Sequence, residues 1–302
     1  MLKKVSRPGM LVALMAVLVP VVSLLALLYT EVGMAKEIGI QEPRLTEYDY
    51  SAIPQSVVED ATALAREVIG GGQDRFQEFV DQQLATYMEA RESDVVVIFN
   101  SGGWGWNLFN DTPGWKSILD GIKSELDFLG YRSLVLNYRR TGSGLLSCIE
   151  EFIEVLTRYP SKGKALAKRV EFLTNHIPNL KIIVAGESTG TVISDKTLGI
   201  LRENPQVYSI QTGTPFWHKP KSLARTLLMN SNGRSIDTFS YGNIPAMIWA
   251  SLKSWLGLSS PEENPGTILS WLRAPGHDYS WQYPGVCSEV IRFLEENFGA
   301  KN

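Results

Sequence analysis

The stretch KIIVAGESTGTVISD, residues 181 to 195, changes character halfway along. Its first five residues form an apolar and partly β-branched run, which is typical of a buried strand. The pentapeptide GESTG, residues 186–190, comes next, and from Thr191 onward the pattern is compatible with a helix. A serine at the centre of a strand-to-helix turn, with a glycine two positions to either side, is either a nucleophile or an ordinary turn residue. The rest of the chain has to decide between these two interpretations.

Composition indicates a globular α/β protein. With 302 residues, of which 44% are hydrophobic and 20% charged, the chain can bury a sizeable core, most simply one large α/β domain with an additional segment. The formal net charge of −3 predicts no general attraction to nucleic acid. No G-x-x-x-x-G-K-[ST] phosphate loop is present, and SGGWGW at 101–106 lacks the G-x-G-x-x-G spacing, so nucleotide binding is not predicted.

The additional segment is at the N-terminus. Residues 11–28 contain no charged side chain, and the wider apolar run reaches the roughly 20 residues that a membrane-spanning helix needs. Lys3, Lys4 and Arg7 precede this run, and their positive charge favours a cytoplasmic N-terminus with the rest of the chain on the extracytoplasmic side. We therefore expect residues 1–36 to form a membrane anchor. A cleaved signal peptide, which would give a secreted protein, is the alternative.

Strand and helix patterns alternate along the remainder of the chain. Residues 37–92 are predicted to contain a linker and two helical segments, 55–69 and 73–90, which three glycines separate. In the following domain, 93–302, apolar strands are predicted at 94–99, 131–137, 181–185 and 207–211. Apolar residues at helical spacing fill the gaps between the first three strands: Ile118, Ile122, Leu126 and Leu129, then Leu146, Ile149, Ile153 and Leu156. This alternation predicts an α/β fold with a mainly parallel sheet flanked by helices.

In such a sheet the loops at the carboxyl ends of the strands share one edge, and ligand sites gather there. Ser188 follows the strand 181–185 at this edge. The glycine-rich loop SGGWGWN, residues 101–107, follows the strand 94–99. Glycines allow the backbone to turn sharply and to approach a ligand closely. The amides of this loop are therefore candidate donors to an oxyanion.

On these residues the chain resembles the α/β-hydrolase superfamily of esterases, lipases, thioesterases and related enzymes. GESTG at 186–190 matches the nucleophile elbow G-x-S-x-G, whose tight turn strains the serine and presents its oxygen above the sheet. The resemblance implies that Ser188 is the nucleophile. It also implies an oxyanion hole formed by the backbone amides of Thr189 and of the glycine-rich loop, at Gly103. It implies no cofactor and no metal.

A serine hydroxyl needs a base, and a histidine is the usual one. The chain has three histidines and no C-x-x-C or H-x-x-x-H spacing, so a metal site is not predicted. His176 comes just before the strand 181–185 and should lie at the opposite edge of the sheet. His218 follows the next strand on the correct edge and stays an alternative base.

His277 is the preferred base. It follows the apolar segment 267–272, which we expect to be the last strand, and precedes a terminal helix from about 284 to 298. The resemblance implies this order of last strand, loop histidine and final helix.

The triad acid is expected between the serine and the histidine, commonly after a strand. No convincing strand is evident between residues 211 and 267. Among the acids in that interval, Asp237 lies in the loop-like sequence GRSIDTFSYGN and is the preferred acid. Glu262 and Glu263 follow a proline and are more typical of the first turn of a helix. An unusual acid position, or a dyad without an acid, stays open.

Residues 214–265 are predicted to form a mostly helical cap, which includes the apolar segment IPAMIWASLKSWLGL at 244–258. A cap rich in Trp, Met and Leu above the active edge would suit an acyl chain, and Trp104 and Trp106 would add aromatic walls. Two alternatives are open for the segment 244–258: packing onto the sheet and an amphipathic helix at a membrane interface.

Together these inferences predict a membrane-anchored serine hydrolase that acts on a small-molecule or lipid ester or thioester, with catalytic residues Ser188, His277 and Asp237. The alternative is a noncatalytic, membrane-tethered binding protein with the same fold. Cys148 and Cys287 are consistent with an exported domain, although the sequence does not determine whether they pair.

Overall fold

The structure is a computed structural model of the chain, and it describes residues 50–68, 73–103, 105, 109–139, 145–221, 223–259, 266–269 and 271–301. The apolar run 11–28 and the two glutamates at 262 and 263 lie outside these ranges. Among the residues that are described, no helix has both the length and the apolar character needed to cross a bilayer. The predicted anchor therefore stays a prediction.

Five parallel strands form the main sheet, in the order β2-β1-β3-β4-β5. Their bounds are β1 Val95–Asn100, β2 Ser133–Asn137, β3 Lys181–Glu187, β4 Val207–Thr212 and β5 Thr226–Met229. The first four lie within two residues of the strands predicted from the sequence. In the register of the sheet, Val97 of β1 lies between Val135 of β2 and Ile183 of β3. The prediction of an α/β fold with a mainly parallel sheet is confirmed.

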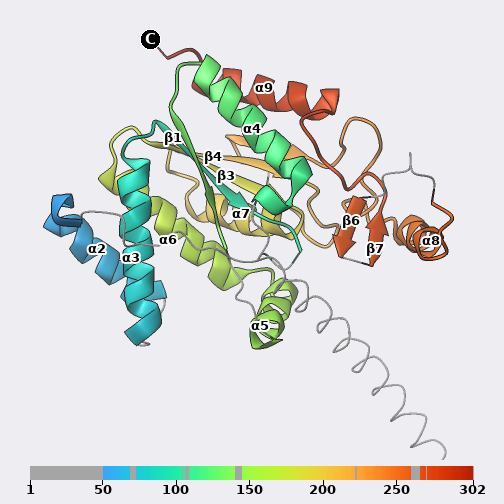
Figure 1. The fold of residues 1–302 in the computed structure, drawn as a ribbon, viewed down its shortest axis with the longest axis horizontal. Coiled ribbons are helices and arrows are strands. Elements are labelled where there is room, and N and C mark those ends of the chain that lie inside the picture. Colours follow the sequence, from blue (N-terminus) through green and yellow to red (C-terminus); the bar gives the residue numbers. More distant parts are fainter. Residues whose placement is uncertain are drawn as a thin grey trace, which may run out of the picture.

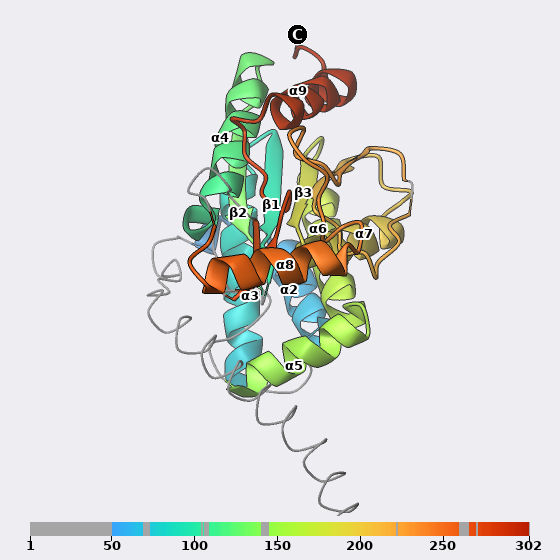
Figure 2. The ribbon, with the colours of Figure 1, turned by 90° about the vertical axis from the view of Figure 1, so that its right-hand side faces the viewer.

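Helices cover both faces of this sheet and give three layers (Figures 1 and 2). Val96 and Ile182 face one helical layer, and their strand neighbours Val97 and Ile183 face the other. The first layer consists of α2 Gln55–Val68, α3 Gln73–Ala90, α6 Pro160–His176 and α7 Thr189–Ile200, and the second of α4 Pro113–Phe128 and α9 Pro284–Phe298. Because both faces are buried, β1 and β3 are continuous apolar runs.

The gap between β2 and β3 holds two helices, α5 Leu145–Leu156 and α6. The helix predicted from the apolar spacing at 146–156 is therefore confirmed. However, α6 supplies the buried contacts with the sheet, through Leu166 and Val170, whereas Ile153 and Leu156 of α5 are exposed. The periodicity of α5 thus correctly predicts a helix, but its apolar residues Ile153 and Leu156 are not buried against the sheet.

Two expectations about the strands were wrong. A strand does occur between residues 211 and 267, because β5 pairs in parallel with β4, and Ile210 lies beside Leu227. Its four residues, TLLM, give no periodic pattern, and of these only Met229 is buried. The segment 267–272 is also not the last strand of the main sheet. It divides between β6 Gly266–Leu269 and β7 Leu272–Ala274, which form a separate antiparallel hairpin.

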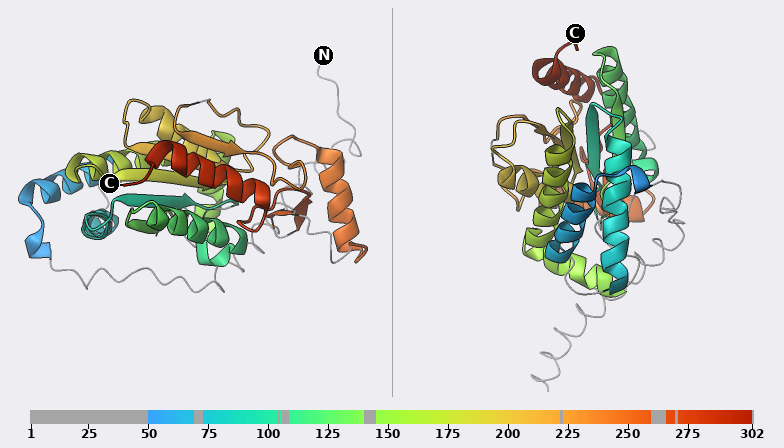
Figure 3. Two further views of the ribbon diagram at one scale, coloured as in Figure 1. Left: turned by 90° about the horizontal axis from the view of Figure 1, so that it is seen from above. Right: turned by 90° about the vertical axis from the view of Figure 1, so that its left-hand side faces the viewer.

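The predicted cap region, 214–265, consequently has a mixed structure. It contributes β5 to the main sheet, and the helix in its described part is α8 Ile244–Trp255, which packs against β7. Helix α8 and the hairpin lie at one end of the molecule, beyond the three layers (Figures 1 and 3). The expectation of a mostly helical cap is therefore wrong for the described residues.

The chain reverses its direction of travel across the sheet between β1 and β3. It runs outward from β1 to β2 and then returns to the other side of β1. In open parallel sheets the loops at such a point diverge and leave a crevice where ligands bind. The loop after β1 carries Gly103, and the turn after β3 carries Ser188.

Candidate active site

Ser188 lies in a strained turn between β3 and α7. Its φ of 50° and ψ of −122° lie in a region that residues other than glycine rarely adopt. The glycines on either side are needed for this turn. A Cβ atom at Gly186 would stand 2.7 Å from the Ser194 hydroxyl, and one at Gly190 would stand 2.2 Å from the carbonyl oxygen of Asn100. The local geometry is that of a nucleophile elbow.

The hydroxyl of Ser188 is buried and has no hydrogen-bond partner among the described residues. Buried hydroxyl groups are usually hydrogen-bonded, so an unpaired one calls for an explanation. The backbone of the same residue is fixed, since its N–H donates to the carbonyl oxygen of Thr212 at 2.9 Å. In hydrolases without substrate the bond from nucleophile to base is often long and tightens only in the complex. Ser188 thus combines a fixed backbone with an unengaged oxygen.

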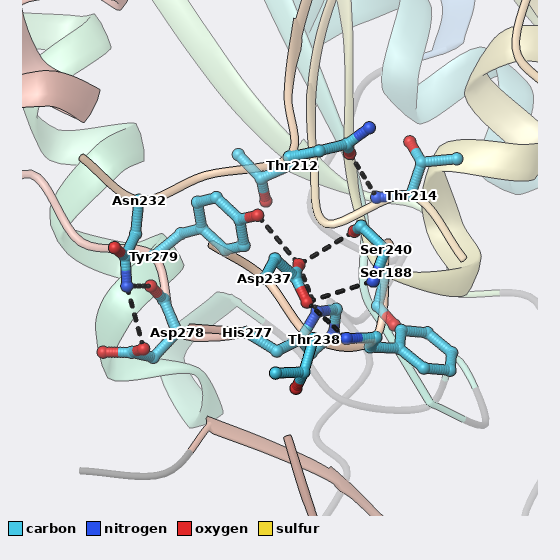
Figure 4. A network of polar contacts seen from close by, with 12 residues as sticks. Ser188, Thr212, Thr214, Asn232, Asp237, Thr238, Ser240, His277, Asp278 and Tyr279 are labelled. Atoms are coloured by element: carbon cyan, nitrogen blue, oxygen red, sulfur yellow. Dashed lines mark hydrogen bonds and ion pairs between the residues drawn. The ribbon is translucent and has the colours of Figure 1, made fainter. Parts of the chain in front are cut away.

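His277 lies beside this turn, three residues after the end of β7. Its Nδ1 is 2.8 Å from Oδ2 of Asp237, and both side chains are buried. Gly213 follows the residue that binds the Ser188 backbone, and a Cβ atom at Gly213 would stand 2.6 Å from Cε1 of His277. The imidazole therefore packs against the segment to which Ser188 is hydrogen-bonded. Figure 4 shows Ser188 in the same close-up as the hydrogen-bonded pair of His277 and Asp237.

Asp237 is fully buried and accepts five hydrogen bonds (Figure 4). Three reach Oδ2, from His277 Nδ1 at 2.8 Å, Tyr279 OH at 2.9 Å and the Ser240 hydroxyl at 2.9 Å. Two reach Oδ1, from the backbone N–H of Phe239 at 2.9 Å and of Ser240 at 3.1 Å. So many donors stabilise the ionised form of a buried carboxyl group.

The pKa values of this network follow from the same contacts. Burial on its own would raise the pKa of Asp237, but the hydrogen bond and electrostatic attraction of His277, together with the bonds from Ser240, lower that pKa below its usual value. The pKa of Tyr279 is raised strongly, first by burial and then by the negative charge of Asp237. Asp237 is thus a carboxylate at neutral pH, and Tyr279 is a neutral donor to it.

The two residues predicted to form the oxyanion hole lie together. The Thr189 hydroxyl donates to the carbonyl oxygen of Gly103 at 2.9 Å. Thr189 is also the first residue of α7, so its peptide group lies at the positive end of the helix dipole. The amide of Gly102 donates to Oε2 of Glu187 at 3.2 Å, which ties the loop after β1 to the elbow.

The other two histidines have separate partners. His176 ends α6 at the opposite edge of the sheet, as expected, where its Nε2 is 3.1 Å from Oδ2 of Asp60. His218, the alternative base, forms a buried pair with Asp195 of α7, with Nε2 at 3.0 Å from Oδ2. The histidine beside the elbow is therefore His277.

Three residues of the network escaped the sequence reasoning: Tyr279, Ser240 and Gly213. Tyr279 lies two residues after His277, a spacing that puts both side chains on the same side of an extended segment. Ser240 lies three residues after Asp237. The Asp237 side chain accepts the backbone N–H groups two and three residues further along, in an Asx turn, which is a pattern that aspartate favours in loops. Gly213 directly follows β4 and has a φ of 68°.

The described residues contain no cluster of three or more His, Cys, Asp or Glu side chains that could hold a metal ion. Cys287 carries a free thiol. The described part of the site presents the Ser188 hydroxyl, the His277 imidazole, the Asp237 carboxylate and nearby backbone amides.

No protein-family model matches the chain, and no curated protein is significantly similar to it. Among solved structures the chain is similar to Trichoderma reesei cutinase in complex with a C11Y4 phosphonate inhibitor, at 14% sequence identity and a TM-score of 0.42. That similarity covers 81% of this chain and 94% of the cutinase chain. At this level it carries no functional inference. The parallel sheet flanked by helices and the strand-elbow-helix unit agree with the fold that the resemblance to the α/β-hydrolase superfamily implies.

Proposed function

We propose that the chain is a serine hydrolase that cleaves a carboxylic ester or thioester, with Ser188 as nucleophile, His277 as base and Asp237 as the acid that orients the base. The observation that carries this proposal is the 2.8 Å bond between His277 Nδ1 and the buried Asp237 carboxylate, beside a strained serine whose hydroxyl is unengaged. An ordinary turn serine requires neither the strain nor the adjacent pair.

The geometry supports a two-step acyl transfer. Asp237 holds the proton of His277 on Nδ1, so the lone pair of Nε2 is available to accept the hydroxyl proton of Ser188. The serine oxygen then attacks the substrate carbonyl, and we assign the amides of Thr189 and Gly103 to the resulting oxyanion. His277 returns the proton to the departing alcohol or thiol as the acyl-enzyme forms. Water, activated by the same imidazole, hydrolyses the acyl-enzyme and regenerates Ser188.

An apolar acyl group fits the residues around the base. The ring of Phe239 is 5.0 Å from the ring of His277, and the half-exposed ring of Phe216 is 6.1 Å from Phe239. These rings offer an apolar wall next to the reacting atoms. Cleavage rates that did not change with acyl-chain length would contradict this part of the proposal.

We further propose that the catalytic domain lies on the extracytoplasmic side of a membrane, to which residues 11–28 anchor it. The uncharged run and the basic residues before it support this assignment. Secretion after cleavage of a signal peptide is the alternative. N-terminal sequencing of the mature protein separates the two, since cleavage would remove the run.

A fluorophosphonate probe tests the catalytic assignment, because it reacts covalently with an activated serine. We expect the wild-type chain to be labelled and to hydrolyse a short-chain ester, and Ser188→Ala to lose both, with turnover reduced on the order of a millionfold. Ser288→Ala, which removes an exposed hydroxyl on α9, is the matched control and should behave as the wild type. Labelling of neither the wild type nor the variant would favour the noncatalytic binding protein.

A further inference from the structure

Helix α8 turns one narrow side toward the protein and most of its large apolar side chains toward solvent. Met247 and Ser251 are buried against the hairpin, whereas Ile248 is 54% exposed and Trp249 is 63% exposed. We call the exposed large apolar residues of 244–258 the α8 ridge, and they are Ile244, Ile248, Trp249, Leu252, Trp255, Leu256 and Leu258. Single exposed apolar residues are common on protein surfaces, but a contiguous set of this kind marks an interaction surface.

Polar contacts fix this orientation. The hydroxyl of Ser251 accepts the backbone N–H of Arg273 at 3.0 Å, and the hydroxyl of Ser254 accepts Nε of the same residue at 3.1 Å. Trp255 Nε1 donates to the carbonyl oxygen of Trp271 at 3.1 Å. Turning the α8 ridge inward would break all three bonds, so its exposure is a property of the fold.

The charge around the α8 ridge favours an anionic or neutral partner. The segment 213–259 contains one acidic side chain, Asp237, which is fully buried in the site. Its basic residues are Lys219, Lys221, Arg225, Arg234 and Lys253. The chain as a whole has more acidic than basic residues, so this segment departs from the rest, and its one acidic side chain is buried away from anionic lipid headgroups. The next acidic residues, Glu262 and Glu263, follow the α8 ridge in the sequence and lie outside the described residues.

We propose that the α8 ridge inserts into the boundary between headgroups and acyl chains of a lipid bilayer. An apolar helical face with tryptophans and without acidic side chains is the composition that such interfaces bind. The chain before the first described residue supports this occupant. If residues 11–28 span a bilayer, the roughly 20 residues from there to Tyr50 reach at most about 70 Å, which keeps the domain close to the same surface.

The proposed docking surface connects directly to the candidate active site. Met247, on the inner side of α8, packs with Phe239 and Ala274 in a small separate core. Phe239 in turn contacts the ring of His277, and the His277 N–H donates to the carbonyl oxygen of Ala274 at 3.0 Å. Docking through the α8 ridge would therefore bring the catalytic edge toward lipid, in addition to the anchor. This inference goes beyond the proposed hydrolysis and does not depend on it.

Site-specific fluorescence on the full chain tests the proposal. In a Cys148→Ser, Cys287→Ser background, Leu252→Cys carries an environment-sensitive nitrobenzoxadiazole dye on the α8 ridge. Phe128→Cys is the matched control, since Phe128 is an equally apolar residue, 82% exposed, at the far end of α4 on the opposite edge of the sheet. Both proteins are placed in vesicles of phosphatidylcholine and phosphatidylglycerol, with or without a nitroxide-labelled lipid.

We expect the dye at position 252 to shift to the blue and to lose emission when nitroxide lipid is present, and the dye at position 128 to do neither. Equal behaviour at the two positions would overturn the proposal. A blue shift at 252 that nitroxide lipid does not quench would also overturn it, because a second copy of the chain would then cover the ridge.

A second measurement uses no dye, so that it does not depend on whether the dye disturbs folding. Brominated phosphatidylcholine quenches tryptophans within the bilayer, and we expect it to quench a smaller fraction of the emission of Trp249→Phe than of the wild type. An equal fraction in both would place Trp249 outside the lipid and refute the insertion. Neither readout requires ester hydrolysis, so failure here is distinguishable from failure of the Ser188 labelling.

Discussion

The molecule contains two buried pairs of histidine and aspartate, and they differ in which ring nitrogen is engaged. In the pair beside the elbow, Asp237 binds Nδ1 of His277 at 2.8 Å, which leaves Nε2, the nitrogen farther from the backbone, for other chemistry. In the second pair, Asp195 binds Nε2 of His218 at 3.0 Å, and the remaining Nδ1 is buried without a partner among the described residues.

The surroundings of the two carboxylates differ as well. Asp237 accepts five hydrogen bonds and lies at the catalytic edge. Asp195 lies within α7 and also accepts the backbone N–H of Lys221 at 3.0 Å, so its pair ties the loop after β4 to the helix. A buried histidine and aspartate pair is therefore not by itself a catalytic signature. The free nitrogen and its neighbours decide the role.

The largest expected difference between the pairs is in turnover after removal of the imidazole. His277→Ala should lower kcat on the order of a millionfold, because the triad acts as a unit. His218→Ala should keep the kcat of the folded enzyme within a few-fold of wild type and lower stability instead. Ester turnover and urea unfolding of both purified variants would measure this. Loss of catalysis in a folded His218→Ala variant would contradict the assignment of a structural role to His218 and a catalytic role to His277.

Substitution of the carboxylates should give the next largest effect. Asp237→Asn favours the wrong tautomer of His277 and should lower kcat about 10⁴-fold. Asp195→Asn should leave kcat nearly unchanged and reduce the free energy of unfolding by about 3 kcal/mol, as expected for a broken buried pair. Single-turnover kinetics and denaturant titration distinguish the two, and similar kcat values for both variants would contradict the assignment of Asp237.

Asp237→Asn should also change how the free energy of unfolding depends on pH in the acidic range. The folded pKa of Asp237 is lowered, so near and below pH 4 the unfolded state binds more protons than the folded state, and the wild type loses stability as the pH falls. The variant lacks this contribution and should lose less stability over the same range. Denaturant titrations between about pH 6 and pH 3 measure the difference.

Gly213→Ala should lower kcat about 100-fold through displacement of the imidazole. The added methyl group would meet Cε1 of His277 at 2.6 Å, and the backbone there has a φ of 68°. Gly257→Ala is the matched control, since Gly257 has a φ of 69° and no atom within 4 Å of the added Cβ. Both variants share the backbone strain, so an equal loss of kcat in the two would show that contact with His277 is not the cause.

The smallest expected effect follows Tyr279→Phe. This variant removes one of five donors to Asp237, and we expect a loss of about 2 kcal/mol in unfolding free energy and up to about tenfold in kcat. Because the folded pKa of Tyr279 is raised, only the unfolded state ionises near pH 10, and wild-type stability falls as the pH rises above that value. The variant should show a shallower decline between about pH 9 and 11, and an unchanged slope would contradict a buried neutral phenol.

Local patterns were sufficient to predict the central part of the fold. The apolar run and glycines at 181–190 identified β3 and the elbow, because a buried parallel strand and its turn have strong residue preferences. Strand β5 could not be found this way, since its four residues, of which only Met229 is buried, acquire their structure by pairing with β4. Chain order favours Asp237 as the acid even though the sequence does not reveal β5. Its five donors depend on loop contacts that sequence spacing does not specify.

For the apolar segment 244–258, too, contacts with residues distant in the sequence determine a feature that the local pattern does not. Its composition left three interpretations open, and periodicity alone could not choose between them. The direction of α8 depends on hydrogen bonds that Arg273 of the hairpin donates to the hydroxyls of Ser251 and Ser254. Tertiary contacts of this kind set which side of an apolar helix faces solvent.

The backbone conformation of Ser188 lowers the stability of the fold at the same residue to which we assign the nucleophile. A serine at a φ of 50° costs about 1–2 kcal/mol that a glycine at that position would largely avoid. The well-packed strands on both sides of β3 hold the residue in this conformation. A Ser188→Gly substitution would therefore relieve backbone strain and at the same time remove the side chain to which we assign the chemistry.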